Sequence, residues 1–237
     1  MNVSVSQVAA MIDHAILKPE LTRTEVDADL ALAAAYKIFS VCVRPSDIAH
    51  AVSTLEGSGV AVGTVIGFPH GTTSTAAKVA EVTQGIADGA VEFDMVINVG
   101  WLRSGMLAEV EADIRAVVEA ARGHLVKVIL ETAYLSDDEI VQGCRAAEAA
   151  GADFVKTSTG FAAGGATLPH LTLMRASVSQ AVQVKASGGV RSLDTLLEML
   201  ALGVTRFGTS ATATILDDLA KREAGEIGPG VIDESSY

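Results

Sequence analysis

The stretch VKVILETAYLSDDEIVQGCRAAEAAGADFVKTSTG, residues 126–160, contains the unit from which the fold can be worked out. It opens with VKVILET and closes with DFVKTS, two short runs rich in β-branched and apolar residues that are typical of buried strands. Between them Ser136 and Glu139 form a capping box, which marks a helix start, and Gly151 suits a left-handed helix end. The stretch therefore predicts a strand, a helix and a second strand.

The same unit recurs along the chain. Strand-like runs end about every 28 residues, Ala-rich helical segments separate most of them, and a second capping box, Thr22 with Glu25, precedes VDADLALAAAYK. The runs are MIDHAI, FSVCV, VAVGTVIGF, VEFDMVI, VKVILET, DFVKTS, QVKAS and RFGTS. Eight alternations imply parallel strands with right-handed crossovers, so we predict an α/β fold, a single-domain (β/α)8 barrel. The alternative, an open doubly wound sheet, usually carries GxGxxG after its first strand, and the sequence has none there.

The composition fits one globular domain over residues 1–237. The chain is 49% hydrophobic, 4% aromatic and 19% charged, which excludes disorder and is enough to bury a core without disulfides or a structural metal. Its net charge of −12 argues against nucleic acid and membrane as partners, because both require a basic face. A small anionic ligand remains compatible, since it needs only a local cradle of amides and one or two cations.

The start of the chain and its two cysteines indicate a cytoplasmic protein. MNVSVSQVAAMIDH lacks the regions of a secretion signal, and no stretch approaches the roughly 18 apolar residues of a membrane span. Cys42 and Cys144 are solitary, which favours reduced thiols. Residues 225–237, GEIGPGVIDESSY, are Gly-rich, acidic and aperiodic, so we expect a mobile tail.

Charged residues are conspicuous inside three of the strand-like runs, VEFDMVI, DFVKTS and QVKAS. Barrel strands alternate between the interior and the helix layer, and this alternation places Asp94, Lys156 and Lys185 on the interior face. They should converge near the strand ends, where active sites of this fold lie. An ion-pair network that merely holds the strands together is the alternative, although two lysines for one obvious acid weaken it.

A pair of close lysines has a chemical use. A lysine amine is nucleophilic only when it is neutral, and a neighbouring ammonium together with partial desolvation lowers its pKa, as enzymes that form Schiff bases require. Lys156 is the better nucleophile, because the hydroxyl residues and the glycine that follow it suit a hydroxylated substrate. Lys185 would then be the perturbing cation and Asp94 a proton shuttle.

The residues after Lys185 suggest an anion site. Gly188 and Gly189 offer bare amides, Arg191 a guanidinium, and Ser192 can cap the next helix. Ser210 closes the neighbouring run, and loops after the last two strands commonly bind phosphate in this fold. The glycines could instead serve only tight turns, but beside a candidate lysine the anion site is favoured.

Other polar residues carry weaker signals. The five histidines show no HxH or HExxH spacing, so we expect no catalytic metal and no cofactor. Cys42 in SVCVRP is most simply a buried small residue, although its interior-facing position could bring the thiol near a bound aldehyde.

These residues resemble the deoxyribose-phosphate aldolase family, class I aldolases of the TIM-barrel type. The resemblance covers nearly the whole chain in the family's order: IDHAILKP, VCVRPSDI, IGFPHG, EFDMVINVG, VKVILET, DFVKTSTGF, KASGGVR and RFGTSA. It implies reversible cleavage of 2-deoxy-D-ribose 5-phosphate into D-glyceraldehyde 3-phosphate and acetaldehyde without a metal or organic cofactor. Its partners would be a phosphorylated sugar and aldehydes, and a homodimer is left open.

The resemblance also implies roles for single residues. Lys156 in KTSTG looks like the Schiff-base lysine, Lys185 in KASGG like the lysine that tunes it, and Asp94 in EFD like the relay carboxylate. Asp13 in IDH resembles a supporting acid, and Thr159 matches a contact to a substrate hydroxyl. Positions of the phosphate loops are matched by Gly188, Gly189 and Ser210.

Two features depart from the pattern or extend it. Phe161 stands where some members have a phosphate-binding lysine, and Ala211 where a second serine can occur, so phosphate binding should lean on backbone amides and Arg191. Tyr237 resembles a terminal tyrosine that can reach the site. The alternative functions are those of another Schiff-base sugar-phosphate aldolase, a transaldolase, or a non-catalytic sugar-phosphate-binding barrel.

Overall fold

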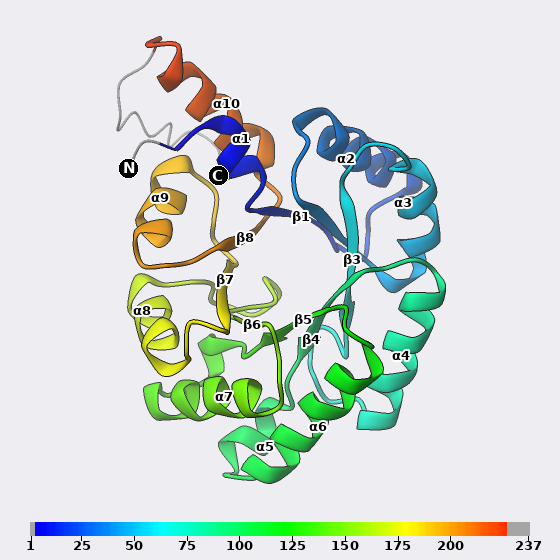
Figure 1. Cartoon of the computed structure of the whole chain (residues 1–237), viewed down its shortest axis with the longest axis vertical. Helices are drawn as coiled ribbons and strands as arrows, with labels where there is room; N and C mark the ends of the chain where they lie inside the picture. Colours follow the sequence, from blue (N-terminus) through cyan, green and yellow to red (C-terminus); the bar gives the residue numbers. More distant parts are fainter. Residues whose placement is uncertain (1–2, 227–237) are drawn as a thin grey trace.

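The computed structural model describes residues 3–226, which form a closed barrel of eight parallel strands inside a layer of helices (Figure 1). Each strand pairs with the next in the chain, and β8 returns to β1. The strands are β1 (Ile12–Ile16), β2 (Ser40–Val43), β3 (Ala61–Ile66), β4 (Glu92–Val96), β5 (Leu125–Ile129), β6 (Phe154–Lys156), β7 (Gln183–Ser187) and β8 (Arg206–Thr209). The predicted (β/α)8 barrel is thus confirmed.

Helices connect the strands and cover their outer faces (Figure 1). They are α1 (Val5–Ala9), α2 (Arg23–Tyr36), α3 (Ile48–Thr54), α4 (Thr75–Ala87), α5 (Val99–Arg103), α6 (Leu107–Ala120), α7 (Asp137–Ala149), α8 (Leu168–Ser177), α9 (Leu193–Ala201) and α10 (Thr212–Glu223), with 3-10 turns η1 (Pro45–Asp47) and η2 (Thr132–Tyr134). Within residues 3–226, no helix is long and apolar enough to cross a membrane. The predicted mobile tail lies, from residue 227 onward, outside the described residues.

The predicted helix ends are present. Thr22 and Glu25 form a capping box at the start of α2, and Ser136 and Glu139 form one at the start of α7. Gly151, just after α7, has φ +85°, a left-handed value that costs glycine little. Local sequence therefore determines where these helices begin and end.

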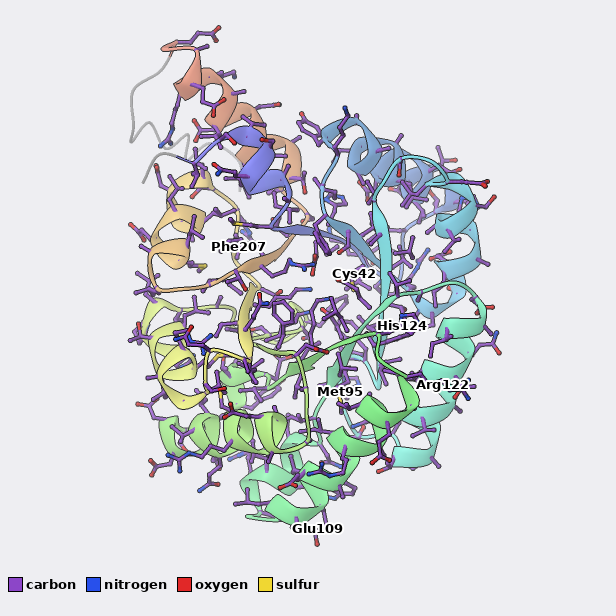
Figure 2. All side chains as sticks on the ribbon, in the orientation of Figure 1. Cys42, Met95, Glu109, Arg122, His124 and Phe207 are labelled. Atoms are coloured by element: carbon purple, nitrogen blue, oxygen red, sulfur yellow. The ribbon has the colours of Figure 1, made fainter. Side chains whose placement is uncertain are left out.

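The apolar core lies between the barrel and the helices. Outward-facing strand residues such as Phe93, Val155 and Phe207 are fully buried there, and each contributes about 1.5–3 kcal/mol by leaving water. Figure 2 shows Cys42 among the strands and Glu109 on α6, at the outer edge of the molecule. The inside of the barrel differs, because charged side chains occupy positions that branched aliphatic residues usually fill.

The strand register brings these charged positions together. Asp94 on β4 lies opposite Lys127 on β5, and Lys185 on β7 lies between Lys156 on β6 and Arg206 on β8. Residues opposite each other in a parallel pair point to the same face, so the charged side chains share the barrel interior.

Candidate active site

Lys156 and Lys185 meet at one oxygen atom of Asp94. Lys156 Nζ and Lys185 Nζ each donate a hydrogen bond of 2.7 Å to Asp94 Oδ2. All three side chains are buried, with at most 3% of each residue exposed. The structure therefore brings the predicted nucleophile, perturbing cation and proton shuttle into direct contact.

A third lysine holds the other oxygen of the same carboxylate. Lys127 Nζ donates to Asp94 Oδ1 at 2.9 Å and to Glu92 Oε2 at 2.7 Å. Because both oxygens of Asp94 are engaged, the carboxylate is fixed in orientation, with Oδ2 toward the other two lysines. The sequence reasoning missed Lys127, although the same alternation rule applied to VKVILET would have placed it in the interior.

Asp13 and Arg206 complete the buried network. Asp13 Oδ2 accepts from Lys185 Nζ at 2.6 Å, while Asp13 Oδ1 accepts from Arg206 Nη1 at 2.8 Å and from Ser40 Oγ at 2.7 Å. The Arg206 guanidinium stacks on the ring of Phe39, 3.6 Å from its centroid. Lys185 Nζ thus binds Asp13 as well as Asp94.

The count of two interior lysines for one acid was wrong. The described barrel interior contains Lys127, Lys156, Lys185 and Arg206 together with the carboxylates Asp13, Glu92 and Asp94. The sequence argument left out the cations Lys127 and Arg206, because their ion-pair partners depend on which residues of neighbouring strands lie opposite each other. A structural ion-pair network and a pair of close lysines therefore coexist in one cluster.

Burial and charge separate the two lysines by pKa. Burial, helped by the Lys185 ammonium, lowers the pKa of Lys156 even though Asp94 opposes the change. Burial also acts against the charge of Lys185, but Asp13 and then Asp94 outweigh it and raise the pKa of Lys185. Asp94 is buried too, yet its three lysine neighbours hold its pKa well below the ordinary range. Lys156 is thus the amine most easily deprotonated of the pair.

An open cavity of about 480 Å³ extends from these lysines to the loops after β7 and β8. Its buried part includes Lys156, Lys185 and Asp13, and its exposed part includes Arg191 and Ser210. Parallel strands point their carboxyl ends to this rim, where ligands of barrel enzymes bind. A substrate could therefore reach the amine while its far end stays near the loops.

The predicted anion cradle lines the same cavity. Gly188 and Gly189 have φ values of +81° and +80°, and Ser192 caps α9 by accepting from Thr195 N. A Cβ atom at Gly188 would lie 2.9 Å from Gly165 Cα, so this glycine also permits a close approach of two loops. Gly188, Gly189 and Arg191 therefore line the cavity together, and α9 begins two residues after Arg191.

Thr159 and Cys42 also line the cavity, with different surroundings. The Thr159 hydroxyl donates to Glu131 Oε2, and its oxygen accepts from Phe161 N at 3.0 Å. The predicted contact of Thr159 with a substrate hydroxyl stays a prediction, because this side chain already has two protein partners. Burial raises the pKa of the Cys42 thiol to about 11, so the thiol is protonated at neutral pH.

Other expectations concern metal ions and the end of the chain. Among residues 3–226, no group of three or more His, Cys, Asp or Glu side chains could hold a metal ion. Tyr237 lies outside the described residues.

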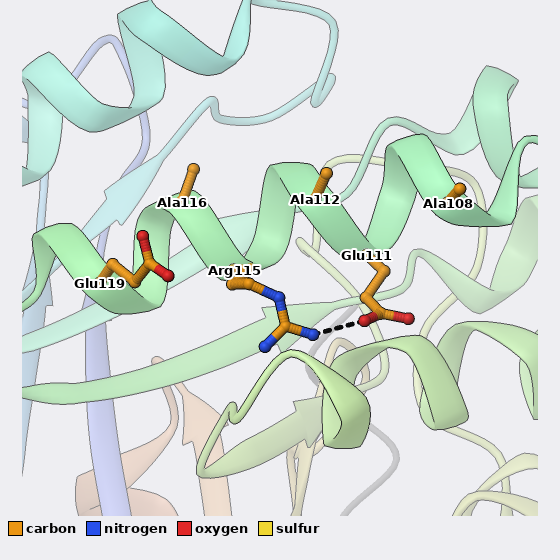
Figure 3. A pocket seen from close by; sticks show the side chains of 6 residues that line it. All are labelled: Ala108, Glu111, Ala112, Arg115, Ala116 and Glu119. Atoms are coloured by element: carbon orange, nitrogen blue, oxygen red, sulfur yellow. Dashed lines mark hydrogen bonds and ion pairs between the residues drawn. The ribbon is translucent and has the colours of Figure 1, made fainter.

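A shallow hollow on α6 is lined by three alanines, Glu119 and an ion pair between Arg115 and Glu111, and it offers no nucleophile (Figure 3).

The fold and site together define a class of protein. The barrel has two buried lysines on one carboxylate oxygen, and burial lowers the pKa of Lys156. Their cavity is also lined by glycines and an arginine, a combination typical of a Schiff-base enzyme for small anionic carbonyl compounds.

The comparisons with known proteins agree with this class. The model of the DeoC/LacD family aldolases matches residues 7–217. Deoxyribose-phosphate aldolase 2 of Staphylococcus aureus (strain MRSA252) is 52% identical over 211 residues, covering 89% of this chain and 96% of the relative. Deoxyribose-phosphate aldolase 1 of the same strain is 52% identical over 208 residues, covering 88% and 94%.

A solved structure extends the likeness to three dimensions. The tetrameric deoxyribose phosphate aldolase from Aeropyrum pernix superposes with a TM-score of 0.85 at 28% identity, covering 92% of this chain and 93% of that one. The chain belongs to the DeoC/LacD family of aldolases.

Proposed function

We propose that this chain is a class I aldolase that reversibly cleaves 2-deoxy-D-ribose 5-phosphate into D-glyceraldehyde 3-phosphate and acetaldehyde. The observation that carries the proposal is the placement of Lys156 and Lys185 on one oxygen of Asp94 inside a cavity with an anion cradle. The activity named for relatives that are 52% identical over most of the chain supports this substrate.

The first half of the reaction needs a neutral amine. Lys156 Nζ attacks C1 of the open-chain aldehyde, and the carbinolamine loses water to give a protonated imine. This iminium draws the electron pair of the C2–C3 bond as the C3 hydroxyl gives up its proton to a base. The bond breaks, D-glyceraldehyde 3-phosphate leaves, and an enamine of acetaldehyde stays on Lys156.

The second half returns the enzyme to its starting state. The enamine carbon takes a proton, the iminium forms again, and water hydrolyses it to acetaldehyde and free Lys156. Asp94 and Lys185, joined by a hydrogen bond of 2.7 Å, are the groups nearest to Lys156 that can hold and move these protons. We assign the relay to this pair, with Asp13 as a second partner of Lys185.

The phosphate would lie on the loops after β7 and β8. Gly188, Gly189 and Ser210 supply amides and a hydroxyl, and Arg191 supplies a positive charge at the cavity mouth. Phe161 lines the same cavity without a charge, whereas Lys18 lines it as a second exposed cation, so Arg191 and Lys18 are the positive charges at the mouth that a phosphate could meet.

Reductive trapping tests the covalent step. Acetaldehyde with sodium cyanoborohydride should add an ethyl group to Lys156, detected by peptide mass mapping, and the Lys156→Ala variant should lack that adduct. Labelling by a ketose phosphate alone would favour another Schiff-base aldolase or a transaldolase. Active wild-type protein with no adduct would refute the Schiff-base mechanism, and absence of turnover with ligand binding intact would favour a sugar-phosphate-binding barrel.

We also propose that the protein is cytoplasmic, and a homodimer is the assembly that the resemblance leaves open. Cys42 and Cys144 are both buried free thiols, as a reducing compartment favours. Light scattering on the purified chain measures the oligomer, and a tetramer like that of the Aeropyrum pernix relative, or a monomer, would contradict the dimer.

A further inference from the structure

A second cavity, called the side cavity below, adjoins the one that holds the lysine pair. Its volume is about 320 Å³, and Leu17 and Phe161 line both cavities. Most of its other walls come from the carboxyl ends of β1, β2 and β3 or from the residues just beyond them. The loops after β7 and β8, which carry the anion cradle, contribute none of the described residues that line it.

The inner part of the side cavity reaches the barrel interior. Val65 on β3 lines it, is buried, and lies opposite Asp94 on β4 in the strand register. Residues opposite each other in a parallel pair point to the same face, so Val65 faces the interior as Asp94 does. Asp94 in turn binds Lys156 Nζ at 2.7 Å. The side cavity therefore extends inward to a strand position next to the carboxylate that holds the reacting lysine.

The walls of the side cavity are mostly apolar. Phe68 and Phe161 pack edge to face, with ring centroids 5.2 Å apart and ring planes at 86°. Leu17, Val65 and three prolines add apolar surface, and a proline lacks the backbone N–H that an anion site uses. Phe161 is 45% exposed, so its ring has area to cover. An apolar group that fills the cavity would leave water and would cover this surface.

The charged residues that line the side cavity have opposite signs and are already engaged. Arg44 Nε donates to Asp47 Oδ2 at 2.6 Å, and Arg44 Nη1 donates to three backbone carbonyl oxygens. Glu81 Oε2 accepts from Gly67 N at 2.6 Å. A phosphate there would meet the Glu81 carboxylate and, among the described lining residues, no unengaged cation. The side cavity thus suits an uncharged group, unlike the cradle beside Arg191.

We propose that the side cavity is a second acceptor subsite, which binds the apolar tail of an uncharged aldehyde while the carbonyl group of that aldehyde lies at Lys156. This inference rests on the proposed function and extends it to a further activity, the addition of acetaldehyde to aliphatic aldehydes. The tail of a phosphorylated acceptor reaches the anion cradle, whereas an apolar tail enters the side cavity past Leu17 and Phe161.

The chemistry is that of the reverse aldol reaction. The enamine carbon of acetaldehyde bound to Lys156 forms a bond with the carbonyl carbon of the acceptor, and the carbonyl oxygen takes a proton and becomes a hydroxyl. Water then hydrolyses the iminium on Lys156. The products are a 3-hydroxyaldehyde and the free lysine.

A series of unbranched aldehydes from propanal to heptanal tests the inference on the wild-type enzyme. Each methylene group that enters the side cavity should raise kcat/KM for condensation with acetaldehyde by about twofold to fourfold, until the cavity is filled. A kcat/KM that stays constant or falls along the series would overturn the inference.

Inorganic phosphate distinguishes the two subsites. It should compete with D-glyceraldehyde 3-phosphate for the anion cradle, and it should leave the rate with hexanal nearly unchanged, because an apolar tail in the side cavity does not occupy the cradle. Equal inhibition of both condensations would place both tails at the cradle and would contradict a separate subsite.

Matched variants test the walls of the side cavity. Phe68 lines the side cavity and not the lysine cavity, so Phe68→Ala should lower kcat/KM for hexanal about threefold to tenfold and leave the value for D-glyceraldehyde 3-phosphate near wild type. Tyr134 is an exposed aromatic residue just after β5 that lines neither cavity. Tyr134→Ala should change neither value. Equal losses for both acceptors in folded Phe68→Ala protein would reject the subsite, and the wild-type series decides the question if this variant does not fold.

Failure of the inference differs from failure of the proposed function. Trapping of acetaldehyde on Lys156 needs no acceptor, so its absence in the wild type would reject the proposed function. Intact trapping and intact condensation with D-glyceraldehyde 3-phosphate, together with no gain along the aldehyde series, would reject only the apolar subsite.

Discussion

Replacing Lys185 by methionine should make Lys156 a much weaker nucleophile at neutral pH. Lys156 now shares one oxygen of Asp94 with a second ammonium, and burial is the larger of the two causes that lower its pKa. Methionine removes the repelling charge, keeps much of the side-chain volume, and leaves Asp94 Oδ2 to Lys156 alone. Both changes favour the protonated amine.

The structure sets the size of the effect. Each lysine nitrogen lies 2.7 Å from the same oxygen, so twice that distance, about 5.4 Å, is the largest possible separation of the two nitrogens. Two unit charges at that distance repel by about 3 kcal/mol at an effective dielectric constant of about 20. Loss of this repulsion corresponds to roughly a hundredfold smaller fraction of neutral amine below its pKa.

The rate of reductive trapping by acetaldehyde, followed by mass spectrometry across pH, measures that fraction. We expect the rising limb of the profile to move to higher pH in Lys185→Met and the trapping rate at neutral pH to fall about a hundredfold. Lys185→Arg retains the charge and should keep the limb near its wild-type position. A limb that stays in place in Lys185→Met would refute the view that repulsion between the two lysines activates Lys156.

Three further predictions concern charge and space in the site. The folded-state pKa values of Asp13 and Asp94 lie below the ordinary 3.8. Their contribution to the free energy of unfolding is therefore complete above pH 3.8 and is lost as the pH falls through the lower pKa values. Urea unfolding between pH 2 and 5 should show the free energy of unfolding falling with pH, and Asp94→Asn should flatten that dependence. Arg191→Ala should lower kcat/KM about tenfold more for the phosphorylated sugar than for 2-deoxyribose, and equal losses would contradict its placement at the phosphate. Gly208→Ala should fold, because its shortest clash is with the end of the Ser187 side chain. It should lose activity, because the new Cβ would also lie 3.3 Å from Cε of Lys185 and crowd that lysine; circular dichroism and turnover measured together check both parts.

The fold could be predicted because its signals are local. Capping boxes at Thr22 and Ser136 depend on residues three positions apart, and both are present where the sequence placed them. The alternation of side chains along a strand likewise placed Lys156 and Lys185 in the interior. The recurrence of the unit then left few topologies to consider.

The rest of the site depends on register and on loop conformation. Lys127 meets Asp94 because β4 and β5 pair at those residues, and no local pattern states which residues of two strands lie opposite each other. Glu131 reaches Thr159 from a left-handed backbone conformation, φ +57°, which is uncommon for a residue with a side chain. The sequence could therefore suggest the reacting lysine but not the partners that hold its surroundings.

The ionic interior explains why a single amine is left to react. Four cationic side chains face three carboxylates in the described barrel, and Arg206 stays protonated at any physiological pH. Electroneutrality then favours one neutral lysine. Lys127 and Lys185 each bind two carboxylates within hydrogen-bond distance, whereas Lys156 binds Asp94 alone among the residues that the structure describes.

Lys156 consequently gives up its proton at the least cost of the buried lysines, and like Lys185 it lines the cavity from which a carbonyl compound would arrive. A buried charge cluster often contributes little to stability compared with apolar packing. Its proposed value in this barrel is to hold the surrounding cations charged, so that Lys156 is the amine whose charge is least supported, fixed beside Lys185.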